Sequence, residues 1–152
     1  MGRYFFDSSA LAKRYHPEAG SPEVERLFAE PGRDIQISRL SFVEIQSVCA
    51  MKVRGGFLTV EEAEMQRERL LADIASGEIE VRSLTADHFS SAERLIARHG
   101  YQHRLRTLDA LQLAVAVELL TEGLLDKFVV ADKVLAEVAA LEGLSVLNPE
   151  TL

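Results

Sequence analysis

Four carboxylates stand at similar places along this chain, just after strand-like apolar runs or in the first turns of expected helices. They are Asp7, Glu44, Asp109 and Asp132. Several carboxylates in one pocket repel one another, and a divalent cation relieves that repulsion. Mg²⁺ and Mn²⁺ prefer oxygen ligands and also accept substrate phosphate. Two such ions about 3.5–4 Å apart would stabilise the attacking and leaving oxygens of a phosphodiester displacement.

The most apolar segment of the chain, residues 106–120, carries one of these acids. Its pattern is that of a helix that is apolar almost all round, which is typical of a helix buried inside a domain. Thr107 is the expected N-cap, and Asp109 falls in the first turn. Because a buried anion is costly unless something pairs with it, the rest of the fold must supply a partner for Asp109.

Strand-like and helix-like segments alternate along the whole sequence. Strands are expected near residues 3–7, 35–37, 79–81, 128–131 and 145–147, with helices between them. This order is typical of an α/β fold with a mostly parallel sheet of about five strands and helices on both faces. Helices at 41–54 and 59–74, divided by Gly55-Gly56, are expected to form a protruding hairpin. In such a sheet ligands bind beyond the carboxyl ends of the strands, where the four acids could meet.

The bulk composition sets limits on the class of protein. The chain has 152 residues, of which 47% are hydrophobic, and this fits one globular domain over residues 1–152. No charge-free run is long enough for a transmembrane helix. One cysteine allows no internal disulfide, which suits the cytoplasm. A net charge of −7 argues against broad nucleic-acid binding, although a small local basic patch remains compatible with it.

Each acid taken singly has a simpler interpretation. An aspartate at a helix start commonly caps the helix and suits its dipole. Glu44 taken singly fits a solvated surface residue. Asp7 and Asp109, however, adjoin strongly apolar segments, where exposed caps are less expected. Spacing alone therefore leaves both a metal site and simple helix capping open.

Four segments, in order from residue 5 to residue 135, add a family resemblance. They read F-F-D-S-S-A-L-A, L-S-F-V-E-I, R-T-L-D-A-L-Q-L-A and V-V-A-D-K-V-L. Together they resemble the successive motifs of PIN-domain proteins, most of all the VapC-type ribonuclease toxins of prokaryotic toxin–antitoxin pairs. The resemblance implies a PIN-like fold and a Mg²⁺- or Mn²⁺-dependent endoribonuclease that leaves 5′-phosphate and 3′-hydroxyl ends.

The resemblance also implies roles for single residues. Asp7, Glu44 and Asp109 match the three core acidic positions of the family, and Asp132 matches a more variable fourth. These four would hold the metal, and Thr107 matches a hydroxyl position that often supports metal-bound water. Many relatives carry Ser or Thr two residues before the fourth acid, where this chain has Val130. This departure leaves open the role of Asp132 and the presence of a second metal.

Two basic clusters are candidates for holding RNA. One lies near Asp7 and the other leads into Asp109; their members are Lys13, Arg14, Arg98, Tyr101, Arg104 and Arg106. Basic side chains would hold phosphates, and Tyr101 could stack on a base. The segment 98–106 fits equally well a solvated loop and helix end. Its histidines lack the tight His/Cys spacing of a zinc site.

The resemblance implies partners as well. VapC-type proteins usually pair with a small antitoxin, whose peptide lies along a groove and can place a basic side chain in the acidic pocket. The hairpin at 41–74 is the candidate for gripping that peptide and for a homodimer interface.

Two alternatives compete with the nuclease interpretation. The first is a PIN-fold adaptor that has lost catalysis and uses its acids as caps or to dock a basic partner. The second is a haloacid-dehalogenase-like phosphatase, which also begins with an aspartate after its first strand but wants a second one where Ser9 stands. A receiver domain would need adjacent acids near Asp7, and these are missing. Without a glycine-rich phosphate loop, nucleotide binding is poorly supported.

Overall fold

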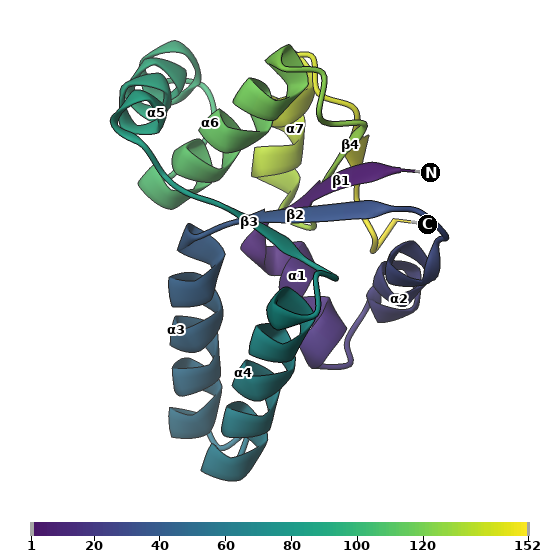
Figure 1. Cartoon of the computed structure of the whole chain (residues 1–152). Coiled ribbons are helices and arrows are strands. Elements are labelled where there is room, and N and C mark those ends of the chain that lie inside the picture. The colour runs from purple at the N-terminus through teal and green to yellow at the C-terminus, as the bar shows by residue number, and fades with distance from the viewer. Residues whose placement is uncertain (1, 152) are drawn as a thin grey trace.

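The computed structural model describes residues 2–151, in which a five-stranded parallel sheet lies between two layers of helices (Figure 1). The elements in chain order are β1 (Arg3–Phe6), α1 (Ser8–Tyr15), α2 (Ser21–Ala29), β2 (Asp34–Ser38), α3 (Leu40–Arg54), α4 (Val60–Ala75), β3 (Glu80–Arg82), α5 (Ala86–His99), α6 (Thr107–Thr121), β4 (Lys127–Val129), α7 (Lys133–Leu141) and β5 (Val146–Leu147). The strand order across the sheet is β3-β2-β1-β4-β5, with every neighbouring pair parallel. The expected α/β fold is confirmed.

The sheet has a hydrophobic core on each face. Successive side chains of a strand point to opposite faces. Accordingly, Phe5 of β1 packs with α5, α6 and α7, whereas Tyr4 and Phe6 pack with the core formed by α1 to α4. Figure 1 shows the same two groups of helices on opposite sides of the strands. The expectation of helices on both faces is therefore confirmed.

Helix α6 is the buried helix that its composition predicts. Its residues from Ala110 to Ala116 are all buried, as is Leu119. The N-cap differs from the expectation, because Arg106 holds that position and Thr107 is the first helical residue. Leu108, in the first turn, is 45% exposed.

Helices α3 and α4 form the expected hairpin, which projects away from the sheet (Figure 1). Gly56 has a φ of +79°, a conformation that residues with a Cβ rarely adopt, and this lets the chain reverse after α3. Thr59 then caps α4, its hydroxyl accepting a hydrogen bond from the Glu62 N–H at 3.1 Å. Across residues 2–151, no helix combines the length and the apolar character needed to cross a membrane.

Candidate active site

A cavity of about 690 Å³ opens at the carboxyl edge of the sheet. The strand order reverses between β1 and β4, and a ligand crevice is expected where this happens in an open α/β sheet. The wall of the cavity contains all four acids singled out from the sequence: Asp7, Glu44, Asp109 and Asp132. The fold thus brings together residues that come from four separate segments of the chain.

Asp7 is the most deeply buried of the four acids, at 5% exposure. It caps α1 by accepting a hydrogen bond from the Ala10 N–H at 3.0 Å. The Ser9 hydroxyl donates to the Asp7 carboxylate at 2.8 Å. Burial is the largest cause that raises the pKa of Asp7, to about 7; the hydrogen bonds oppose the rise and the charge of Glu44 adds to it.

Glu44 is half-buried, one turn into α3. One of its oxygens, Oε1, accepts a hydrogen bond from the Ser8 hydroxyl at 2.7 Å and another from the Gln112 amide at 3.1 Å. These donors come from α1 and α6. Glu44 therefore ties together three helices that border the cavity.

Asp109 lies in the first turn of α6, where its Oδ2 is 3.4 Å from the backbone N–H of Arg106. Burial raises the pKa of Asp109, the hydrogen bond from Arg106 opposes the rise, and the charges of Asp132 and Glu44 add to it. Asp109 thus experiences repulsion from two acids of the same cavity. Asp109 therefore faces other carboxylates, and the hydrogen bond and the charge of Arg106 offset their repulsion only in part.

Asp132 follows β4 at the exposed rim of the cavity and caps α7. Its Oδ1 accepts a hydrogen bond from the Leu135 N–H at 2.9 Å. Val130, two residues earlier, is fully buried in the core. Its side chain therefore packs and supplies no hydroxyl to this wall.

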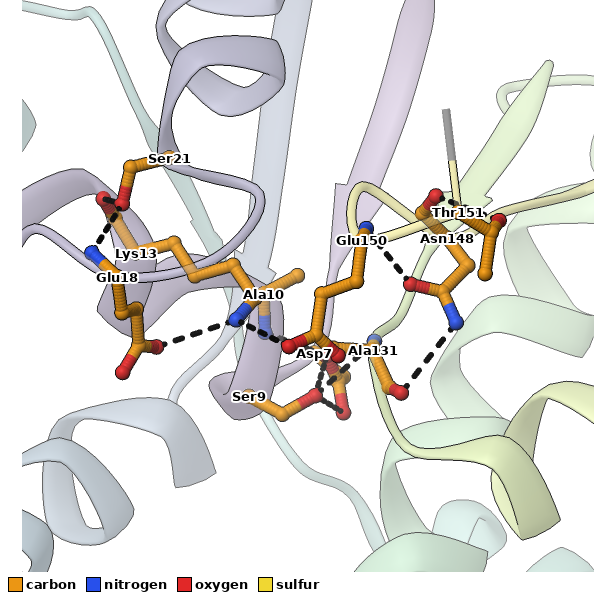
Figure 2. A network of polar contacts seen from close by, with 10 residues as sticks. All are labelled: Asp7, Ser9, Ala10, Lys13, Glu18, Ser21, Ala131, Asn148, Glu150 and Thr151. Carbon is orange, nitrogen blue, oxygen red and sulfur yellow. Dashed lines mark hydrogen bonds and ion pairs between the residues drawn. The ribbon is translucent and has the colours of Figure 1, made fainter.

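Lys13 lies between Glu18 and Glu150, near Asp7, as Figure 2 shows. The Lys13 side chain is 5% exposed, and its Nζ is 3.2 Å from Glu18 Oε1 and 3.3 Å from Glu150 Oε1. Both glutamates also line the cavity, although nothing in their local sequence sets them apart from other surface acids. Gly20, with a φ of +88°, passes close to this place: an added Cβ would lie 3.1 Å from the carbonyl of Pro149.

The segment that brings Glu150 to the cavity is held by Asn148 (Figure 2). The Asn148 side-chain amide donates to the carbonyl of Ala131 at 3.4 Å, and its oxygen accepts from the Glu150 N–H at 2.9 Å. The Ala131 N–H in turn donates to the Ser9 hydroxyl at 3.2 Å. The loop after β4 is thereby connected to Asp7 on one side and to the segment at 148–151 on the other.

Most of the other residues proposed for RNA binding lie away from this cavity. Arg98 pairs with Glu142 at 2.9 Å, and Arg14 pairs with Asp73 and Glu25. Tyr101 and Thr107 line a separate cavity of about 410 Å³. Arg104 and Arg106 are exposed near the start of α6 but are not part of the acidic wall. Of the six proposed RNA-binding residues, Lys13 lines the acidic cavity, and Arg106 contacts Asp109 through its backbone N–H and also acts on it through its charge.

The donors at the cavity suit a hard divalent cation, because they are carboxylate and hydroxyl oxygens. Within residues 2–151, no three His, Cys, Asp or Glu side chains already form a metal-binding cluster. Burial and the charge of Glu44 nevertheless raise the pKa of Asp7, and the hydrogen bonds from Ala10 and Ser9 compensate its charge only in part. A divalent cation would supply that compensation, so the residues fit Mg²⁺ or Mn²⁺ in chemistry and in charge.

Comparisons with known proteins agree with this geometry. The PIN domain family model matches residues 4–141. The structure is similar to VapC20 of Mycobacterium tuberculosis, a sarcin-ricin loop cleaving toxin, with a TM-score of 0.64 and 20% identity over 88% of this chain and 93% of that chain. It is also similar to FitAcB of Neisseria gonorrhoeae, with a TM-score of 0.64 and 18% identity over 98% and 99% of the two chains.

A third similar structure is VapBC2 of Rickettsia felis bound to a DNA fragment from its promoter. The TM-score is 0.62 and the identity 16%, over 96% of this chain and 98% of that chain. At these identities the likeness establishes the fold. No curated protein matches the sequence.

Proposed function

Because the chain belongs to the PIN domain family, as the match over residues 4–141 shows, we propose that it is a metal-dependent endoribonuclease of the VapC toxin type. The observation that carries the proposal is the convergence of four acids from separate segments on one cavity wall. The family match replaces the haloacid-dehalogenase-like alternative. In keeping with this, the residue two after Asp7 is Ser9, whose hydroxyl donates to the Asp7 carboxylate.

The residues of the acidic cavity would have different roles in phosphodiester hydrolysis. Asp7, Glu44 and Asp109 would hold Mg²⁺ or Mn²⁺, with Asp132 as a further ligand at the rim. When bound, the ion supplies Lewis-acid stabilisation of the developing negative charge and lowers the pKa of a water molecule. Lys13 would bind a phosphate oxygen of the RNA, leaving Glu18 and Glu150, which are 36% and 41% exposed, to solvent. The Ser9 hydroxyl keeps the Asp7 carboxylate in place.

An RNA cleavage assay with matched variants tests the proposal. Purified protein is incubated with RNA and Mg²⁺ or Mn²⁺, with EDTA as the metal-free arm. Asp109→Asn should lose cleavage, and Asp126→Asn is the control, because Asp126 pairs with Arg3 at the start of β1, away from the cavity. Full metal-dependent cleavage by Asp109→Asn would refute the assignment.

A second candidate function, a PIN-fold adaptor without catalysis, is favoured by one observation. Asp7 and Asp132 each cap a helix, and Asp109 accepts a backbone hydrogen bond in the first turn of α6. These roles account for three acids without any metal. Calorimetry with Mn²⁺ separates the two candidates: a nuclease binds the ion, whereas an adaptor shows no binding at millimolar Mn²⁺.

We further propose a small antitoxin and a second copy of this chain as partners, because VapC-type proteins usually pair with a small antitoxin and one solved structure of similar fold is a toxin–antitoxin complex from Klebsiella pneumoniae. The hairpin offers an apolar cavity of about 520 Å³ between α3 and α4. Five apolar side chains of the hairpin are mostly exposed, namely Val43, Met51, Phe57, Val60 and Met65. Exposed apolar surface of this kind is typical of interfaces.

The partner proposal has its own test. The chain is co-expressed with its neighbouring gene, and the purified material is sized by light scattering. Met65→Lys should abolish capture of the small partner or dimerisation, whichever uses this face. A wild-type protein that is monomeric and retains no small partner would end this part of the proposal.

A further inference from the structure

Gln112 is a buried amide in an otherwise apolar helix, one turn beyond Asp109 on α6. It is 2% exposed, while its neighbours Leu111 and Leu113 pack in the core. An unpaired amide in such a place destabilises the fold. Gln112 avoids this cost because its side chain is hydrogen-bonded at both ends.

The partners of Gln112 come from three other segments. Its oxygen accepts a hydrogen bond from the Ser38 hydroxyl at 2.9 Å. Its nitrogen lies 3.0 Å from Ser41 Oγ, 3.1 Å from Ser8 Oγ and 3.1 Å from Glu44 Oε1. The end of β2, the start of α1 and the start of α3 therefore all meet at this one amide.

The chemistry of Glu44 fixes which way the amide points. An ionised carboxylate only accepts hydrogen bonds, so the NH₂ group of Gln112 must face Glu44 and its oxygen must face Ser38. Ser8 also donates to Glu44 Oε1, at 2.7 Å. Both hydrogen bonds reach the same oxygen of Glu44, and within residues 2–151 no side-chain or backbone donor occupies the other, Oε2.

We propose that Gln112 is a positioning residue that anchors one oxygen of Glu44 and so presents the other to the divalent cation. This rests on the proposed function, in which Glu44 is a metal ligand. Groups that orient a ligand in this way commonly change metal affinity by about 10–100-fold when they are removed. Gln112 acts through Glu44 and is not itself a metal ligand.

The test compares two substitutions in the same buried network. Gln112→Met keeps the approximate volume and removes the donor to Glu44. Ser38→Ala removes the hydrogen bond on the far side of the amide but leaves Gln112 facing Glu44. Both variants lose buried hydrogen bonds and should be less stable than the wild type. They should differ in metal binding.

Calorimetry with Mn²⁺ is the first readout. The Kd for Mn²⁺ should rise about tenfold or more in Gln112→Met and stay at the wild-type value in Ser38→Ala. At saturating Mn²⁺ the KM for RNA should be unchanged in Gln112→Met. Equal Kd values for wild type and Gln112→Met would overturn the inference. If Gln112→Met does not fold, Gln112→Asn replaces it, because the shorter side chain withdraws the amide from Glu44.

A second readout needs no metal and separates this inference from the proposed function. In the metal-free protein, the ¹³C signal of the Glu44 carboxyl group should shift in Gln112→Met and remain in place in Ser38→Ala. If wild type binds no Mn²⁺, the proposed function fails, and the NMR signal still shows whether Gln112 holds Glu44. An unmoved signal in Gln112→Met would overturn the positioning role whatever the metal result.

Discussion

Asp7 and Glu44 face one cavity from α1 and α3, close enough for the charge of Glu44 to contribute to the raised pKa of Asp7, although burial contributes more. The two residues are 37 positions apart in the chain, and the parallel pairing of β1 with β2 brings the segments that follow those strands to one edge. The raised pKa of Asp7 should make the stability of the metal-free protein depend on pH.

The stability of the metal-free protein should fall as the pH rises. The pKa of Asp7 is about 7 when folded, against an ordinary value of 3.8, so the folded protein binds this proton more tightly. Unfolding then releases a proton between about pH 4 and pH 7, and the free energy of unfolding decreases through that range by about 4 kcal/mol. Asp109, whose pKa is also raised, acts in the same direction. Urea unfolding in EDTA at pH 5 and pH 8 measures the effect.

The control for this prediction is Asp7→Asn. Asparagine can cap α1 as aspartate does, but it does not ionise. Its unfolding free energy should vary less between pH 5 and pH 8 than that of the wild type. Parallel curves for the two proteins would contradict the burial of an uncompensated carboxylate at position 7.

Divalent metal should bind more tightly at higher pH. A ligand carboxylate must lose its proton before it binds a cation, and Asp7 does so at a pKa of about 7. The Kd for Mn²⁺ should therefore fall about tenfold between pH 6 and pH 8. Titration calorimetry at the two pH values provides the measurement. A Kd that is the same at both would remove Asp7 from the ligand set.

Neutralising Lys13 should change the KM for RNA, whereas neutralising Arg98 should not. Lys13→Gln removes a cation at the acidic wall, so the KM for RNA should rise about tenfold and its dependence on salt should weaken. Arg98→Gln removes a cation that is paired with Glu142 elsewhere, so the KM should not change. Steady-state cleavage of a fluorescent RNA at several salt concentrations distinguishes them. A larger rise in KM for Arg98→Gln than for Lys13→Gln would indicate that RNA binds the basic cluster that leads into Asp109.

Asp132 can be tested for two roles separately. Asp132→Asn retains the cap of α7, whereas Asp132→Ala removes it and should cost about 1 kcal/mol of stability. If Asp132 also binds metal, both variants should lose activity at least tenfold. Thermal unfolding and RNA cleavage are measured side by side. Full activity in Asp132→Asn would reduce Asp132 to a helix cap.

The overall architecture follows from the sequence because the pattern of apolar residues is strong. The runs at β1 and β4 are buried, and α6 is apolar enough to indicate a central position. The convergence of the four acids followed from the parallel sheet expected from the alternation of strands and helices. These features depend on local sequence and on general rules of chain topology.

Side-chain partners depend on tertiary contacts and could not be predicted in the same way. Glu150 reaches Lys13 across 137 positions, through a segment held by Asn148. Thr107 and Tyr101 are near Asp109 in the sequence, but they line a neighbouring cavity. The role of Gln112 had one indication in the sequence. An amide on a buried helix, three residues after an acid, needs hydrogen-bond partners.

Helix α6 has a consequence for attempts to re-engineer this protein. The same fifteen residues supply an acid and its neighbouring amide to the cavity and fill the centre of one core. Random libraries over positions 110–116 should therefore yield mostly insoluble variants, and tolerance there should depend strongly on the genetic background. Directed evolution of substrate preference has more freedom at Val43 and Lys52, which line the cavity from α3 and leave the core intact.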